Sequence, residues 1–130
     1  MKQITLIVIF VASITLTRGQ STPREYFNLV KQADSFYKAK EYKKSGYKYS
    51  EAFKLWKGFS YDRYNAACSW TLAAIPDSAF SQLNEIVMKE NYAYYKYIEN
   101  DQDLKPLHKD KRWAPLLEIV KQNEEKAKTK

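Results

Sequence analysis

Very few residues of this sequence could carry out chemistry. The chain of 130 residues has one Cys and one His, Cys68 and His108, far apart in the sequence. A catalytic thiol needs a neighbouring base, and a zinc site needs about four Cys, His or carboxylate ligands, so this pair completes neither. Cys68 follows Ala66-Ala67, where a free Cys serves as a small core residue. We therefore expect no catalytic residue, no metal and no cofactor, and a protein that is not an enzyme.

Two groups of carboxylates are the remaining candidates. Asp101-Gln102-Asp103 begins like a calcium-binding loop, but Pro106 stands where such a loop has Gly, and Arg112 where it has a bidentate Glu. Helix capping is the favoured role for Asp101. The adjacent Glu124-Glu125 would point apart on a helix. Neither group predicts a metal site or an acid–base pair.

The N-terminal segment 1–19 predicts a secretory signal peptide. Lys2 supplies a positive start, and the apolar run from Ile4 to Leu16 is shorter than the ~20 residues that span a bilayer. Small residues precede a cleavage position after Gly19. We expect an exported protein, periplasmic or secreted, with no transmembrane segment after cleavage; a retained anchor is the weaker alternative. With Cys68 alone, the exported part has no internal disulfide.

Positive charge is concentrated in one part of the chain. The sequence has 22 Lys and Arg against 15 Asp and Glu, a formal net charge of +7. Residues 24–57 hold nine basic and four acidic residues, whereas residues 58–130 hold eleven of each. Lys interleaved with Tyr in the first stretch leaves binding to an anionic glycan or lipid surface open. Nucleic acid is a poor target for an exported protein, and we expect none as a partner.

Hydrophobic spacing predicts helices from residue 24 onward, and therefore an all-α fold. Apolar residues recur at intervals of three and four, and few stretches alternate with period two. Breaks at Lys40-Glu41, Gly58 and Ile75-Pro76 divide the first part into four helices paired as hairpins. Thr22-Pro23-Arg24-Glu25 fits a capping box for the first helix, and Asp77 is expected to cap the fourth.

When the sequence is compared with itself at the offset that places Ala33 on Ala67, small and large residues of the two predicted hairpins coincide. A generic four-helix core also needs small residues where helices touch, but it does not predict a single shift that aligns several of them. A 34-residue helix–turn–helix period is the tetratricopeptide spacing. The five coinciding pairs are Ala33 and Ala67, Phe36 and Trp70, Ser45 and Ala79, Tyr49 and Leu83, and Ala52 and Ile86.

The sequence resembles the tetratricopeptide repeat (TPR) family. The segment from Ala33 to Ala52 resembles one repeat, and Tyr64–Trp70 followed by Asp77–Leu83 resembles a second. The stretch from Asn100 to Leu117 resembles the end-of-group segment of exported Bacteroidetes TPR proteins. The resemblance implies two TPR-like helix-turn-helix units in a short right-handed solenoid closed by C-terminal capping helices. Its parts are a lead-in at 20–23, repeat 1 at about 26–58, repeat 2 at about 60–91, a closing segment at about 92–121 and a polar tail at 122–130.

The same resemblance implies a binding surface. In tetratricopeptide units the first helix of each pair lines a concave groove, and aromatic anchors beside polar groups are typical of peptide recognition. We therefore expect a protein-protein interaction module or scaffold that binds a peptide or protein partner, with the anionic surface as the alternative. The implied lining consists of Phe27, Val30, Asp34, Tyr37 and Lys38 from the first unit, and Tyr61, Tyr64, Cys68 and Thr71 from the second.

Overall fold

A computed structural model describes residues 22–130, and every regular element in that range is a helix. The predicted all-α class is therefore confirmed, while the predicted signal peptide at 1–19 lies outside the described residues. No helix in the described part is long and apolar enough to cross a membrane. The elements are α1 (Arg24–Lys38), α2 (Tyr42–Leu55), α3 (Ser60–Leu72), α4 (Pro76–Asn84), a π-helical continuation η1 (Glu85–Lys89), α5 (Tyr95–Asn100), a 3-10 helix η2 (Gln102–Lys109) and α6 (Trp113–Lys128).

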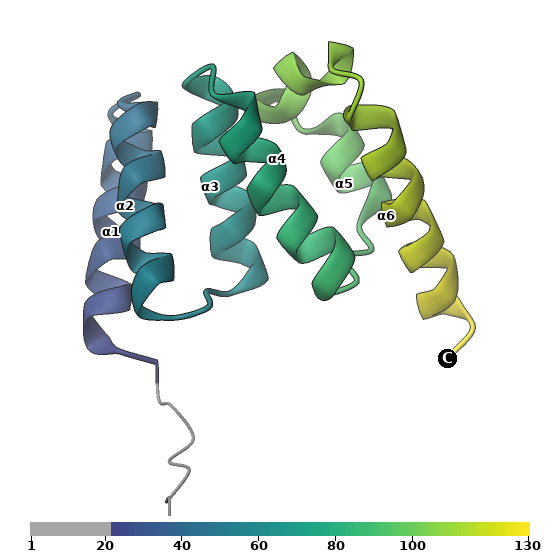
Figure 1. Cartoon of the computed structure of the whole chain (residues 1–130), viewed down its shortest axis with the longest axis horizontal. Helices are drawn as coiled ribbons and strands as arrows, with labels where there is room; N and C mark the ends of the chain where they lie inside the picture. The colour runs from purple at the N-terminus through teal and green to yellow at the C-terminus, as the bar shows by residue number, and fades with distance from the viewer. Residues whose placement is uncertain (1–21) are drawn as a thin grey trace, which may run out of the picture.

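The helices lie side by side in a row, with α1 and α2 at one end and α6 at the other (Figure 1). The hairpin of α1 and α2 packs through α2 onto α3, and α3 also packs on α4 and η2. At the far end α6 contacts α5, η1 and η2. Because α3 contacts both the first hairpin and the closing elements, it is the central support of the molecule.

The turns of the two hairpins have the same geometry. Lys40 and Ala74, which occupy equivalent positions in the two turns, have φ values of 60° and 59°. In each turn the next residue donates its backbone N–H across the helix end: Glu41 to the Phe36 carbonyl at 2.8 Å and Ile75 to the Trp70 carbonyl at 2.9 Å. This left-handed residue after the helix satisfies carbonyls that the helix itself leaves without donors. The predicted breaks at Lys40-Glu41 and Ile75-Pro76 are thus confirmed.

Three predictions about helix ends need correction. Thr22 does not cap α1, because Pro23 occupies that position and no side chain accepts a bond there. Asp77 lies inside the first turn of α4, behind Pro76, and its carboxylate pairs with Arg112 at 2.7 Å instead. Gly58 has the expected left-handed φ of 82°, but α2 already ends at Leu55. The cap at Asp101 is confirmed, since its side chain accepts from the backbone N–H of Asp103 at 2.9 Å.

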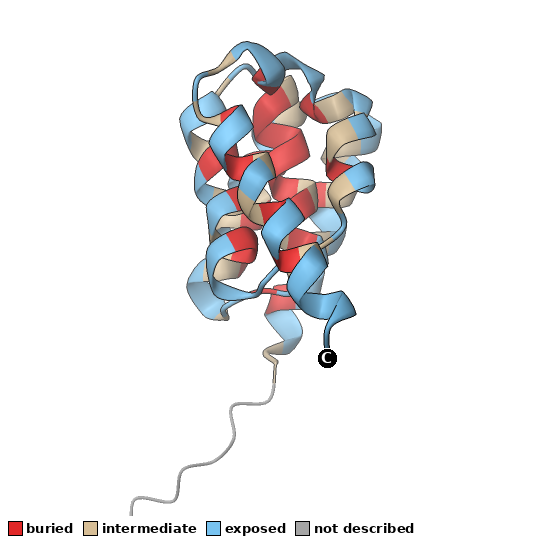
Figure 2. Cartoon of the chain, turned by 90° about the vertical axis from the view of Figure 1, so that its right-hand side faces the viewer, coloured by how far each residue is buried: buried red, intermediate tan, exposed pale blue. Residues whose placement is uncertain are grey.

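Buried residues lie on the inward sides of the helices (Figure 2). The largest cluster joins α3, α4 and η1 to the closing elements. A second cluster fills the first hairpin, and a third joins that hairpin to Ala66 of α3. Of the ten positions that the shift of Ala33 onto Ala67 aligns, all but Phe36 are buried. Between α2 and α3, the hydroxyls of Ser45 and Ser69 are 2.9 Å apart. The shift therefore identifies core positions of both hairpins.

The segment 122–130, predicted as a polar tail, is helical as far as Lys128, where α6 ends. Asn123 is buried, and its Nδ2 donates to the carbonyls of Val87 at 2.9 Å and Tyr92 at 3.1 Å. A polar residue on the inward face of a helix does not register as a core position in a hydrophobic pattern. Asn123 thereby fastens α6 to the end of η1 and the segment that follows.

Candidate binding pocket

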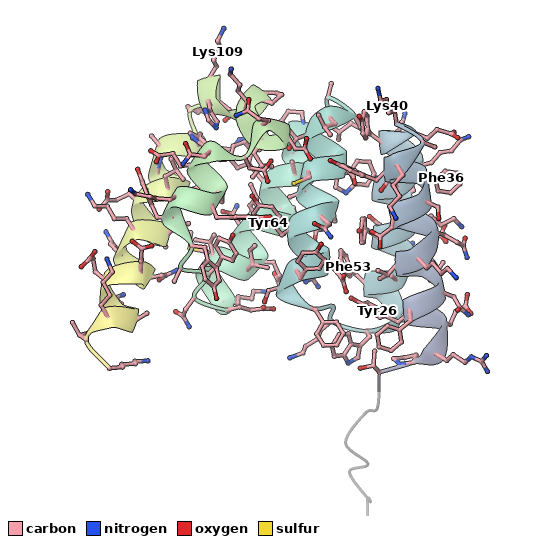
Figure 3. The ribbon with its side chains drawn as sticks, turned by 180° about the vertical axis from the view of Figure 1, so that it is seen from behind. Tyr26, Phe36, Lys40, Phe53, Tyr64 and Lys109 are labelled. Carbon is pink, nitrogen blue, oxygen red and sulfur yellow. The ribbon has the colours of Figure 1, made fainter. Side chains whose placement is uncertain are left out.

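A pocket of about 420 Å³ opens between the first hairpin, α3 and the closing elements. Its residues recur at helical intervals on α1 and α3, so each helix presents one face to it. Tyr64, near the centre of the molecule in Figure 3, belongs to the wall supplied by α3. We call this the aspartate pocket; its lining is Asp34, Tyr37 and Lys38 from α1, Tyr49 from α2, Tyr61, Tyr64, Asn65 and Cys68 from α3, Tyr97 from α5, and Asp101 and Asp103 at the start of η2.

Tyrosine hydroxyls hold the three carboxylates of the aspartate pocket in place. Tyr49 donates to Asp34 Oδ1 at 2.5 Å. Tyr64 donates to Asp101 Oδ2 at 2.7 Å, and Tyr37 donates to Asp103 Oδ2. The last two bonds join α1 and α3 to η2, which lies far along the chain. Hydrogen bonds to a charged acceptor are the stronger kind, so they fix both the pocket wall and the orientation of the carboxylates.

These hydrogen bonds leave two of the six carboxylate oxygens without a donor from the described chain. Asp101 uses both oxygens, because Oδ1 accepts from the Asp103 N–H. Within residues 22–130, Asp34 Oδ2 and Asp103 Oδ1 accept no hydrogen bond. In the same range no Lys or Arg nitrogen lies within 4.0 Å of any of the three carboxylates. With Lys38 as the one basic residue of its lining, the pocket has an excess of negative charge.

Burial favours the protonated form of three tyrosine hydroxyls and of the Cys68 thiol in the pocket. Desolvation is the largest cause that raises the pKa of Tyr37, Tyr49 and Tyr64, followed by the hydrogen bond to a carboxylate. The pKa of the Cys68 thiol is also raised, first by burial and then by the charge of Asp101. A thiol with a raised pKa is a poor nucleophile, because the thiolate is the reactive form. The three phenols, for their part, remain hydrogen-bond donors.

Cys68, Asp101 and Asp103 form the one group in the described chain whose ligand atoms lie close enough together to consider a metal, all within 4.8 Å of one another. The thiol instead lies 3.9 Å from Asp101 Oδ2 as a weak donor. A metal would require that thiol to lose its proton. The geometry therefore favours a hydrogen-bonded cluster, and the absence of a metal stays a prediction.

A second depression continues from the aspartate pocket along α5. Three exposed tyrosines surround it: Tyr61, Tyr94 and Tyr97 have 70%, 69% and 61% of their surface accessible. Tyr64 stacks on Tyr92, with ring centroids 5.8 Å apart, and forms the floor shared with the pocket. We call this the tyrosine groove; it measures about 670 Å³ and is lined by Ser60, Tyr61, Tyr64, Glu90, Asn91, Tyr92, Ala93, Tyr94 and Tyr97.

Six of the nine residues predicted to bind a partner line the aspartate pocket. These are Asp34, Tyr37, Lys38, Tyr61, Tyr64 and Cys68. That the six bind a partner stays a prediction, but the structure does bring them together.

The other three predicted residues lie elsewhere. Phe27 packs on Tyr26 and Phe59, with centroids 5.5 and 6.4 Å apart. Val30 packs against the core of the first hairpin, and buried Thr71 donates to the Ala67 carbonyl at 2.8 Å. These three residues do not line the aspartate pocket, which meets α1 only over residues 34–38 and α3 only over residues 61–68, and that they bind a partner stays a prediction.

The closing elements contribute residues that the sequence did not point to. Tyr97, Asp101 and Asp103 complete the pocket, and Tyr92 and Tyr94 belong to the groove. Helical periodicity is weak in this region, because α5 has six residues and the segment 91–94 before it has no regular secondary structure. The dense tyrosines of the segment 91–97 were the available signal, since exposed Tyr is enriched at binding surfaces.

A family model described as A/B hydrolase-like, N-terminal domain, matches residues 25–128. The chain belongs to this family. The match runs from α1 to the end of α6, so the aspartate pocket and the tyrosine groove both lie inside the family domain. No curated protein and no solved structure matches the chain.

The tetratricopeptide assignment is wrong. The family that matches is the A/B hydrolase-like N-terminal domain, and no tetratricopeptide family model matches. The register between the two hairpins has a simpler physical origin. The helices of the two hairpins are similar in length when η1 is counted with α4, and the same kind of turn joins the helices within each hairpin. The two hairpins therefore need small residues at the same places of close contact. Packing demands of this kind arise in unrelated helical families.

Proposed function

We propose that this A/B hydrolase-like N-terminal domain is a non-catalytic protein-binding domain, and that the tyrosine groove and aspartate pocket dock an α/β-hydrolase-like domain. The proposal rests mainly on a group of exposed tyrosines around a continuous depression, namely Tyr61, Tyr94 and Tyr97. Tyrosine supplies a large contact area at a low cost in conformational entropy, and it is frequent among binding hot spots. The family description, which names an N-terminal domain of hydrolase-like proteins, supports the choice of partner.

The chemistry of the described residues supports binding over catalysis. The Cys68 thiol is buried and has a raised pKa, and His108 stacks on Trp113 at 4.5 Å, outside the pocket. In an α/β-hydrolase the nucleophile sits on a turn between a strand and a helix. Residues 22–130 contain no strand, so a hydrolase reaction would need a partner domain to supply that turn.

We also propose how the hairpins are arranged and where the protein is located. The equal turns after α1 and α3 support stacking of the hairpins as a short right-handed solenoid closed by the C-terminal elements. The apolar run that precedes residue 20 supports export to the periplasm or the exterior.

Site-specific photo-crosslinking in the native host tests the proposed docking. A benzophenone amino acid replaces Tyr61 or Tyr97 in the groove, or Tyr47 of α2 as a control that is also exposed but lines neither depression. We expect positions 61 and 97, but not 47, to crosslink to peptides of an α/β-hydrolase-like domain. Equal capture of that domain at position 47, or no capture at 61 and 97, would contradict the proposal.

The outer end of the first hairpin supports a second candidate, docking to an anionic lipid or glycan surface. Phe27, Leu55 and Phe59 are exposed there, and Lys54 and Lys57 are exposed beside them. Aromatic side chains next to Lys are typical of surfaces that sit at a membrane interface. Cosedimentation with vesicles of equimolar phosphatidylserine and phosphatidylcholine, against pure phosphatidylcholine, tests it. Binding that falls with added salt and with Lys54→Gln would support docking to the lipid surface, and equal recovery from both vesicles would exclude it.

A further inference from the structure

We infer that the aspartate pocket receives an arginine side chain of the bound partner. The inference rests on the proposed protein-binding function and names the chemical group that the pocket recognises. It follows from three observations: uncompensated carboxylates, free and oriented acceptor oxygens, and accessible tyrosine rings at the rim.

The first observation is charge. Asp34, Asp101 and Asp103 are half-buried, and none forms an ion pair within the described chain. Other acidic side chains of the chain do form ion pairs, as Asp77 and Asp110 do with Arg112 at 2.7 Å. Charges partly removed from water attract a counter-charge more strongly than charges at an open surface. The pocket therefore favours a cation that this chain does not provide.

The second observation is the direction of the acceptors. The phenols of Tyr49 and Tyr37 occupy one oxygen of Asp34 and one of Asp103, which fixes each carboxylate and leaves Oδ2 and Oδ1 respectively free of protein donors. A guanidinium has five N–H donors in a planar fork and can serve acceptors on more than one side, whereas an ammonium is a compact point charge. Two separate, preoriented carboxylates thus suit arginine better than lysine.

The third observation is the aromatic rim. Tyr61 and Tyr97 line the pocket and are largely exposed, so their rings are open to a planar cation. Guanidinium groups stack favourably on aromatic faces. The chain shows the same contact twice in its own packing: Arg63 lies 4.4 Å from the Phe53 ring centroid, and Arg112 lies 4.3 Å from that of Phe80.

Lys38 provides a further test, in which a substitution is expected to tighten binding. It is exposed and belongs to the lining of the pocket, so its charge repels an incoming cation. Lys38→Gln is therefore expected to tighten the binding of an arginine peptide. A pocket that recognises an apolar or an acidic group would not respond in this direction.

The test compares two short peptides that differ in a single side-chain group. Acetyl-Leu-Arg-Leu-amide and the same peptide with citrulline, the uncharged isostere of arginine, are titrated into the full chain and followed by ¹H–¹⁵N NMR. The arginine peptide is expected to shift the amide signals of Asn65 and Tyr97 and to bind at least about tenfold more tightly than the citrulline peptide, since charge-assisted hydrogen bonds are roughly twice as strong as neutral ones. A lysine peptide is expected to bind between the two.

Isosteric variants locate the effect. Asp34→Asn and Asp103→Asn keep an oxygen for the phenol and remove the charge, and each is expected to weaken arginine-peptide binding by about 3- to 10-fold. Glu118→Gln, an equal charge change on exposed α6, is expected to leave it unchanged. Far-UV circular dichroism confirms that each variant remains helical.

The results separate this inference from the proposed function. Equal affinity for the arginine and citrulline peptides, or no response to both aspartate variants, overturns the arginine pocket, even where crosslinking at Tyr61 still captures a hydrolase-like domain. A clear preference for arginine that disappears in Asp34→Asn or Asp103→Asn supports the pocket. Binding of the arginine peptide without any hydrolase-like crosslink supports the pocket and contradicts the choice of partner.

Discussion

The packing of Trp70 on α2 shows how single residues fix the fit between the two hairpins. A Cβ atom built on Gly46 would lie 2.6 Å from Cδ2 of Trp70, too close for any unstrained contact. Trp70 is buried, so neighbouring side chains prevent its ring from moving away from the added atom. Gly46 therefore serves close packing between α2 and α3, and its poor helix propensity is tolerated for that reason.

Replacing this glycine tests the contact. Helix propensity alone predicts that Gly46→Ala stabilises the protein by about 0.5–1 kcal/mol. The clash with Trp70 reverses the sign, and we expect the free energy of unfolding to fall by about 1–3 kcal/mol in urea denaturation. Ser50→Ala in the same helix is the control and is expected to stay within about 0.5 kcal/mol of the parent. A stabilised Gly46→Ala variant would show that the packing is looser than described.

The Cys68 thiol offers a second measurement on a single residue. Its burial and raised pKa both disfavour the reactive thiolate. We expect alkylation by iodoacetamide at pH 8 to be at least about 100-fold slower in the folded protein than in urea, because reaction requires local opening. Equal rates would mean that the Cys68 thiol is accessible to the reagent in the folded protein.

At the scale of elements, the sequence predicted the two hairpins far better than the closing segment. The ends of α1 and α3 were visible because the apolar spacing is interrupted at Lys40-Glu41 and at Ile75-Pro76. The segment 92–112 has short helices without a repeating face, so its pattern did not reveal that it completes the pocket. The end of α6 was missed because Asn123, a polar residue, occupies a core position.

The role of Asn123 can be measured directly. Asn123→Ala removes both donors that satisfy the Val87 and Tyr92 carbonyls. Leaving buried acceptors without donors costs about 1–3 kcal/mol, so we expect a loss of that size in urea denaturation. Gln122→Ala on the exposed side of α6 is the matched control and is expected to change stability by less than about 0.5 kcal/mol. Equal losses of stability in the two variants would show that Asn123 contributes no more than an exposed residue of α6.

At the scale of the whole molecule, bonds between tyrosine and aspartate connect elements that are far apart in the chain. Tyr26 donates to buried Asp62 at 2.5 Å, in addition to the three pairs of the pocket. The sequence pointed to six of the seven residues that α1 and α3 contribute to the pocket, all but Asn65. It did not predict these pairings, because partners separated by up to 66 residues leave no periodic signal.

The same pairs make stability depend on alkaline pH. Burial is the largest cause that raises the pKa of Tyr26, Tyr37, Tyr49 and Tyr64, so the folded state keeps these protons at pH values where the unfolded chain, with phenol pKa values near 10, has begun to lose them. The free energy of unfolding is therefore expected to be unaffected by these groups below about pH 9 and to fall as pH rises through 10.

Urea titrations from pH 7 to 10.5 measure this dependence. Tyr49→Phe is expected to reduce the decline above pH 10 by at most about 1.4 kcal/mol per pH unit, the share of one proton. A free energy of unfolding that stays constant to pH 10.5 would show that the phenols are not buried against carboxylates in the folded state.

The central claim is that the tyrosine groove and aspartate pocket form the docking surface for an α/β-hydrolase-like domain. Isothermal titration calorimetry of the two purified domains, with the double variant Tyr61→Ser/Tyr97→Ser, measures it most directly. We predict that affinity falls at least about 30-fold, as expected for the loss of a hot spot worth about 2 kcal/mol or more. Tyr47→Ser, the exposed control outside the groove, is predicted to bind like the parent. Unchanged affinity in the double variant, with its helical content intact, would contradict the claim.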